Sequence, residues 1–143
     1  MSVAPSLRDR IAASNQRGIE AFERADFEGA LAAWSATLRM VDPHDDELAP
    51  AVHENLGLAF FNLGRSHAAA REFLRAMDGD PAARPQSARL AVIALAQMGH
   101  FHHAQSLHAT MEAAIGPHPS LTREELAAWA AQARFARRRA LPG

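Results

Sequence analysis

One arrangement of small residues occurs three times along the chain and limits the folds open to it. A compact residue is followed twelve positions later by alanine, in the pairs Gly18 and Ala30, Gly57 and Ala69, and Val92 and Ala104. Five residues before these alanines stand Ala25, Gly64 and Gly99. Successive copies are 39 and then 35 residues apart, and each is closed by a proline, at Pro43, Pro81 and Pro117. Self-similarity at such a spacing is typical of repeat architectures.

The hydrophobic pattern predicts an all-α chain. Apolar residues recur three and four positions apart almost everywhere, and no segment alternates as a half-buried strand does. Capping residues predict a helix from Ser6 to about Arg24, one from Asp26 to about Val41, and one that starts near Pro50 and ends around Leu63. Further helices are expected from Ser66, from about Pro85, from about His100, and from Ser120 or Thr122. The last has Glu125 at capping-box spacing from Thr122.

Composition narrows the class of protein. The 143 residues fit one domain, and there is no cysteine for a disulfide or a thiolate site. The longest nearly unbroken apolar run, residues 90 to 98, is too short to cross a bilayer, so we expect a soluble cytoplasmic protein without a membrane partner. A net charge of −1 argues against a nucleic-acid surface. All fifteen basic residues are arginine, which suggests a GC-rich, bacterial coding sequence.

The repeat resembles the tetratricopeptide repeat (TPR), a helix-turn-helix unit of about 34 residues. The central copy, about residues 50 to 83, matches best, with signature residues at Leu56, Gly57, Phe60, Gly64, Ala69, Phe73, Ala76 and Pro81. The flanking copies, about 11 to 44 and 85 to 118, are weaker. Ala21 replaces an expected aromatic in the first, and His108 replaces one in the third.

The resemblance implies a right-handed α-solenoid of three units, with residues 1 to 143 forming a single domain. A capping helix at about 120 to 140 should cover the last unit with an apolar stripe of Leu126, Trp129 and Ala133. Within the central unit, we expect Gly57 to permit close helix contact opposite Ala69 and Ala76. Gly64 should lie in the turn, where a positive φ favours glycine.

In proteins of this family, the first helix of each unit lines a concave groove. One column across that groove would be Ile19, Leu58 and Ile93, and the next Phe22, Phe61 and Ala96. The flanking columns would be Asn15, Glu54 and Arg89, and then Glu23, Asn62 and Gln97. Such a surface suits an extended peptide or an amphipathic helix. The alternative is that these columns are ordinary core, hidden by the terminal helix or a loop.

Function is expected from the groove rather than from the fold. The carboxylate clamp of one TPR subclass, which grips the C-termini of heat-shock chaperones, is not expected. Of its positions only Asn55 matches, since Asn15, Ile19, Gln86 and Leu90 occupy the others. Length and an apolar groove agree with the bacterial secretion chaperones of another subclass. We therefore predict a peptide-binding adaptor or chaperone. A self-assembling scaffold, and hence a homo-oligomer, stays the alternative.

Catalytic and metal chemistry find little support in the sequence. His100, His102, His103 and His108 invite a metal site, yet no acidic residue lies among them and no HExxH motif is present. We interpret them as solvated or partly packed residues of a repeat turn. No catalytic constellation stands out, so neither an enzyme nor a cofactor is predicted.

Overall fold

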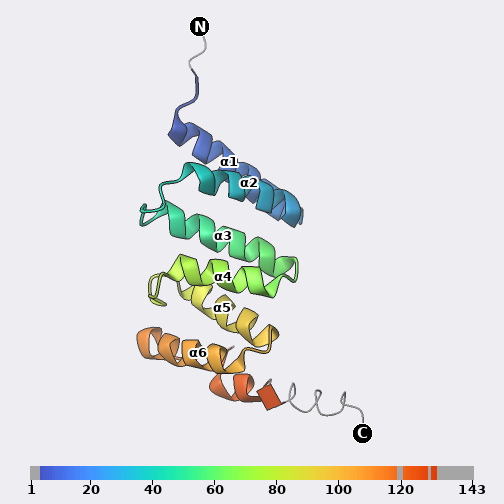
Figure 1. The fold of residues 1–143 in the computed structure, drawn as a ribbon, viewed down its shortest axis with the longest axis vertical. Helices are drawn as coiled ribbons and strands as arrows, with labels where there is room; N and C mark the ends of the chain where they lie inside the picture. The colour runs from blue at the N-terminus through green and yellow to red at the C-terminus, as the bar shows by residue number, and fades with distance from the viewer. Residues whose placement is uncertain (1–3, 119–120, 129, 132–143) are drawn as a thin grey trace.

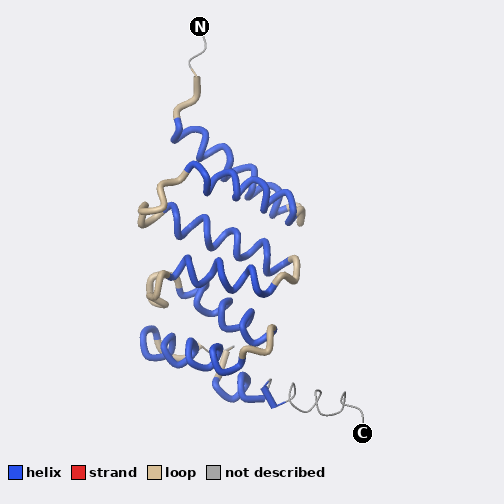
Figure 2. Tube along the Cα trace, in the orientation of Figure 1, coloured by secondary structure: helices blue, strands red, loops and turns tan. Residues whose placement is uncertain are grey.

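The computed structural model describes residues 4–118, 121–128 and 130–131, and this part of the chain is all-α. Six helices stack in chain order from one end of the molecule to the other (Figure 1). They are α1 (Leu7–Glu23), α2 (Phe27–Met40), α3 (Leu48–Asn62), α4 (Ser66–Met77), α5 (Pro85–Gln97) and α6 (Phe101–Ile115). Residues 123–128 and 130–131 are also helical. Figure 2 shows no strand in the described ranges, where His118 and Leu121 form an isolated bridge. The all-α prediction is confirmed for these residues.

Local capping explains where the first helices begin. The Ser6 hydroxyl accepts a hydrogen bond from the backbone N–H of Asp9 at 3.1 Å, and the Asp9 carboxylate accepts one from the Ser6 N–H at 3.4 Å. This reciprocal pair satisfies two otherwise unpaired donors. Asp26 caps α2 by accepting from the Gly29 N–H at 3.0 Å. Both predicted caps are therefore confirmed.

The same type of turn joins α1 to α2, α3 to α4 and α5 to α6, which are called here the first, second and third helix pairs. The residues at its centre, Ala25, Gly64 and Gly99, have φ values of 61°, 74° and 81°. The backbone N–H of the next residue bonds five positions back each time, from Asp26 to Ala21, from Arg65 to Phe60 and from His100 to Leu95, at 2.8–3.0 Å. Positive φ with such a bond is the usual way to end a helix sharply. The three predicted turns are confirmed, and alanine bears the positive φ in the first.

At two glycines an aromatic ring of the partner helix packs against the helix backbone. A Cβ atom on Gly18 would lie 2.2 Å from Nε1 of Trp34, and one on Gly57 would lie 2.6 Å from Cε1 of Phe73. Trp34 and Phe73 are 2% and 0% exposed. The three atoms nearest to this Cβ position on Gly57 all belong to the Phe73 ring, whereas the sequence predicted Ala69 and Ala76 opposite this glycine.

The third pair of helices carries Val92 and His108 at the positions of this glycine and aromatic residue. Both side chains are fully buried. The prediction that His108 is solvated or partly packed is wrong, since its Nε2 atom lies 2.8 Å from the carbonyl oxygen of Leu121. Nδ1 of His108 is buried and has no hydrogen-bond partner among the residues that the structure describes. This histidine links α6 to the segment that follows it.

Helix packing follows chain order, and the buried side chains form two clusters that meet at α3. Each helix packs on the next, and α3 also contacts α5. One cluster includes Ala21 of α1, Trp34 of α2 and Leu56 of α3, and the other extends from α4 to the residues after α6. Phe60 packs against both clusters. Because α3 contributes to both, the described helices share one continuous packing.

The segment after α6 covers the last helix pair. The Thr122 hydroxyl accepts from the Glu125 N–H at 3.2 Å, and Glu125 Oε2 accepts from the Thr122 N–H at 2.9 Å, so the predicted capping box is confirmed. Leu121 and Leu126 are each 1% exposed and belong to the cluster of α4–α6. The predicted stripe residues Trp129 and Ala133 and the arginines from Arg134 to Arg139 lie outside the described residues.

The glycine contact predicts the effect of Gly57→Ala. Alanine is the better helix former by about 1 kcal/mol, yet its methyl group would meet the Phe73 ring. We expect a net loss of about 1–3 kcal/mol in the free energy of unfolding, measured by urea denaturation. In a Phe73→Leu background the same change should be less destabilising. Strictly additive losses in the two variants would contradict the contact.

The covering segment predicts a second stability effect. Leu126→Ala should lower the free energy of unfolding by about 2–5 kcal/mol, because it opens a cavity beside α6. The matched control is Leu7→Ala, since Leu7 is 54% exposed. Equal melting temperatures for the two variants would show that residues 121–128 do not stabilise the last helix pair.

Candidate functional site

The eleven residues expected to line a groove lie on three alternate helices. α1 carries Asn15, Ile19, Phe22 and Glu23, α3 carries Glu54, Leu58, Phe61 and Asn62, and α5 carries Arg89, Ile93 and Gln97. Glu23, Asn62 and Gln97 are exposed, and the other eight are half-buried. Ala96, which completes the second column, is 7% exposed. The eleven side chains are therefore accessible to different degrees.

The apolar residues of this set also pack against the core. Ile19 and Phe22 contact the α1–α3 cluster, whereas Leu58, Phe61 and Ile93 contact the other. The Phe22 ring lies 5.8 Å from that of Trp34, and the equivalent rings of Phe61 and Phe73 lie 6.4 Å apart. The sequence left open whether these columns are groove or core. In the folded chain each of the five apolar side chains has one part packed and another exposed.

Polar residues at the edges of the columns connect successive helix pairs. The Asn55 side chain donates to Oδ1 of Asn15 at 3.4 Å, which joins α3 to α1. Ser87 on α5 donates to the Glu54 carboxylate, and Arg84 lies 3.6 Å from the same group. At the opposite edge, Ser66 donates to Oε1 of Gln97 at 2.9 Å. These contacts hold neighbouring edge residues in a fixed arrangement.

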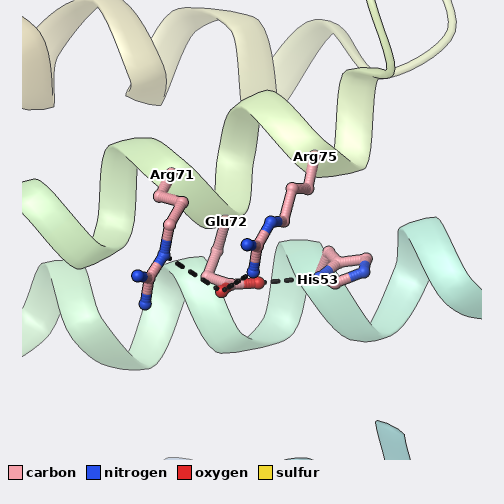
Figure 3. A network of polar contacts seen from close by, with 4 residues as sticks. All are labelled: His53, Arg71, Glu72 and Arg75. Carbon is pink, nitrogen blue, oxygen red and sulfur yellow. Dashed lines mark hydrogen bonds and ion pairs between the residues drawn. The ribbon is translucent and has the colours of Figure 1, made fainter.

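A buried carboxylate between α3 and α4 is a feature that sequence reasoning missed. Glu72 is 4% exposed, and its Oε2 atom lies 2.7 Å from Nδ1 of His53. Its Oε1 atom accepts from Arg75 at 3.1 Å and lies 3.8 Å from Nε of Arg71. Figure 3 shows both arginines converging on this carboxylate from α4, with His53 reaching it from α3. Burial of the charge is tolerated because three cationic or polar partners surround it.

A sequence signal for this buried position was present. Glu72 stands three residues after Ala69 and four before Ala76, and both alanines are buried on the apolar face of α4. A helix places residues at such spacings on one face. The position of Glu72 therefore indicates burial, although its residue type alone suggests exposure.

The histidines predicted to lie in a repeat turn separate into two groups. His100, His102 and His103 are exposed at the start of α6, whereas His108 is buried. In the described part of the chain, no group of three or more His, Cys, Asp or Glu side chains could hold a metal ion. The geometry thus offers no metal centre within these residues.

The acidic segment before α3 borders an open cavity of about 790 Å³. Its lining includes Asp45, Asp46, Glu47, Asp78 and Asp80 together with the basic groups His53, Arg75 and Arg84. The Asp45 carboxylate accepts from the backbone N–H groups of Leu48 and Glu47 at 2.7 and 2.9 Å, and these bonds lower its pKa. Asp45 thus fixes the start of α3.

Comparison with known proteins adds no assignment. No family model matches the sequence, and no curated protein matches it. Among the described helices, none combines the length and the hydrophobicity that a bilayer span requires.

The buried carboxylate yields a prediction about stability. Glu72→Gln keeps the shape of the side chain but removes its charge, so the bonds to His53 and Arg75 should weaken. We expect the free energy of unfolding to fall by about 1–3 kcal/mol in urea denaturation. The control is Glu28→Gln, which removes the exposed ion pair with Arg65 and should change stability little. Similar small effects in both variants would contradict a structural role for Glu72.

Proposed function

We propose that the chain is a TPR domain, a right-handed α-solenoid of three units with a terminal capping helix. Support comes from the three equivalent turns and from the glycine–aromatic contact that recurs between α1 and α2 and between α3 and α4. Each turn residue and each glycine of the first unit lies 39 residues before its counterpart in the second. The first two copies of the sequence repeat have the same spacing. Contacts that recur in the folded chain support a structural repeat more strongly than similar residue types in the sequence do.

On this proposal the protein is a non-catalytic adaptor or chaperone that binds a peptide or helix of a partner protein. The observation that carries it is the placement of the eleven predicted groove residues. All lie on the first helices of the units, and all keep accessible surface. Half-buried apolar side chains in rows with polar edges suit a ligand that presents apolar groups at regular intervals.

The apolar residues of the predicted groove are half-buried, so each contact with a ligand side chain buries only part of an apolar surface. Leu58, Phe61 and Ile93 are held by the core on one side, so little side-chain freedom is lost when a ligand covers the other. Full burial of an apolar anchor contributes about 1.5–3 kcal/mol, and a partly exposed one contributes less. Several rows are therefore needed for micromolar affinity, for which about 8 kcal/mol is required.

Two groove variants test the proposal. Peptides are first selected on the wild-type protein from a displayed library, and their affinities are then measured by fluorescence anisotropy. Leu58→Glu should weaken binding by about tenfold or more, because a charge replaces an apolar contact. Asn62→Ala changes only an exposed edge residue and should weaken binding less while leaving the helicity intact.

The matched control is Ala32→Glu, which places the same charge at an exposed position of α2. It should bind the selected peptides as the wild type does. Circular dichroism confirms that each variant is folded before its affinity is compared. If no peptide is selected by the wild type, or if folded Leu58→Glu binds all of them unchanged, the groove is not the binding surface.

A further inference from the structure

A pocket separate from the groove lies between α1 and α2, at the N-terminal end of the stack of described helices (Figure 1). It is open, has a volume of about 510 Å³ and is called here the α1–α2 pocket. The lining residues that carry the argument are Arg10, Ala13 and Arg17 of α1 and Ala36, Arg39 and Met40 of α2. No lining residue is one of the eleven predicted groove residues. An occupant of this pocket would therefore not compete directly with a groove ligand.

The α1 side of the pocket is a helix face without a neighbour among the described helices. In α3 the corresponding residues, 39 positions later in the sequence, are buried in the cluster that α3 shares with Trp34 of α2, and they are Ala49, Val52 and Leu56. On α1 their counterparts are all exposed, and they are Arg10, Ala13 and Arg17. α1 packs mainly on α2, so the described chain leaves this face open. Since this face of α3 lies against another helix, a helix is the shape of occupant that the same face of α1 fits.

The three arginines of the pocket have no acidic partner. All sixteen Asp and Glu residues belong to the described part of the chain. Six of the eleven arginines in that part lie within 4.0 Å of a carboxylate. Arg10, Arg17 and Arg39 make no such ion pair with the described residues, and all three line this one pocket. Their guanidinium groups therefore keep their donors for an external anion.

Acidic groups of the pocket do not balance this charge. Among the described residues Asp9 is the single acidic member of the lining, and its carboxylate accepts from the Ser6 N–H at 3.4 Å in the capping box of α1. The buried member of the lining is Ser14, whose hydroxyl donates to the carbonyl oxygen of Ala33 at 2.9 Å. The pocket thus presents positive charge to an occupant, while its buried hydroxyl is already paired within the chain.

The spacing of the arginines matches a second helix. Arg10 and Arg17 are seven residues apart on one face of α1, which is about 10 Å along the helix axis. A helix that lies alongside α1 has the same rise per residue, so two carboxylates seven residues apart on it can face both guanidinium groups. Arg39 adds a third positive charge from α2, and the half-buried Met40 offers an apolar contact.

We propose that the α1–α2 pocket binds an acidic helix of a partner protein. The helix lies alongside α1, with two carboxylates seven residues apart facing Arg10 and Arg17 and an apolar side chain against Met40. Charge complementarity selects the acidic partner, and the spacing selects a helix whose carboxylates lie on one face. Because the ion pairs are exposed, salt weakens the complex.

The probe is a blocked, fluorescent peptide of sequence AQAEAQALAAEAQALA, called here the one-face peptide. Its alanines favour a helix, and its two glutamates, seven residues apart, lie on one helical face with a leucine between them. One control, AQAQAQALAAQAQALA, replaces both glutamates by glutamine. The other, AQAEAQALAAQAEALA, keeps the composition but places the glutamates nine residues apart, on opposite faces of the helix.

Each peptide is titrated with the full chain and followed by fluorescence anisotropy in about 0.1 M salt. The one-face peptide should bind about three- to tenfold more tightly than either control, because an exposed ion pair contributes up to about fivefold. Raising the salt to about 0.5 M should remove most of this difference, since exposed charges are then screened.

Two arginines of α1 supply the matched variants. Arg17 lines the pocket and Arg8 does not, although both are exposed and neither forms an ion pair with the described residues. Arg17→Glu should reduce binding of the one-face peptide to the level of the glutamine control. Arg8→Glu should change it by about twofold or less, since charges outside the pocket are partly screened. Circular dichroism establishes that both variants keep their helicity.

The proposal is overturned if the folded wild-type chain binds the three peptides alike or not at all, or if Arg8→Glu and Arg17→Glu lose binding equally. A nucleic acid is the competing anionic partner, and fluorescent oligo-dT of about 15 nucleotides tests it under the same conditions. Tighter binding of oligo-dT than of the one-face peptide would assign the pocket to nucleic acid instead. The groove residues are unchanged in both variants, so failure here is independent of the groove experiment.

Discussion

The contact between a glycine of one helix and an aromatic ring of its partner sets the spacing of the first two helix pairs. Gly18 lies against Trp34 and Gly57 against Phe73, both sixteen residues later in the sequence. Any side chain on these glycines would enter the space of the ring. The aromatic residue fills the centre of each pair, and the turn geometry then fixes where the second helix starts. The half-buried residues of the proposed groove depend on this arrangement, since Phe22 and Phe61 pack on the same rings.

The third pair solves the packing differently and joins the end of the stack. Val92 and His108 replace the glycine and the aromatic ring, and both are buried. A histidine has ring nitrogens that phenylalanine lacks, and Nε2 of His108 lies within hydrogen-bond distance of the Leu121 carbonyl oxygen. The histidine that replaces an aromatic residue of the repeat thus helps to attach the segment that covers α6. Arg123, which lies 3.1 Å from Glu112 of α6, adds a second link.

Features that depend on local sequence could be predicted, and features that depend on tertiary contacts could not. The capping residues Ser6, Asp26 and Thr122 and the turns at Gly64 and Gly99 follow from hydrogen bonds and φ preferences of a few neighbouring residues. The partner of Gly57 belongs to another helix, and its identification required the register between the two. The sequence repeat does align the two helices, because Trp34, Phe73 and His108 occupy equivalent positions in its three copies. All three residues are buried. Because histidine is polar, His108 was nevertheless predicted to be solvated or partly packed, which is wrong. For the same reason the burial of Glu72 was not predicted.

The sequence predicts which helices carry the candidate site residues, but not how far each side chain is exposed. Helical periodicity and the spacing of the sequence repeat place Ile19, Leu58 and Ile93 on α1, α3 and α5, and all three are half-buried there. How far each side chain projects from the core depends on the rings beneath it, which sequence spacing does not describe. The edge contacts between Asn55 and Asn15 and between Ser87 and Glu54 likewise depend on how the helices pack on one another.

The central claim is that stacked helix pairs present the face of α1, α3 and α5 to a peptide ligand. The most direct test is an NMR titration of the isotope-labelled chain with a peptide selected on it, in which backbone amide shifts are followed residue by residue. The account predicts that the largest shifts fall in α1, α3 and α5, around Ile19, Leu58 and Ile93. Shifts concentrated instead in α2, α4 and α6, or in the acidic segment before α3, would contradict it.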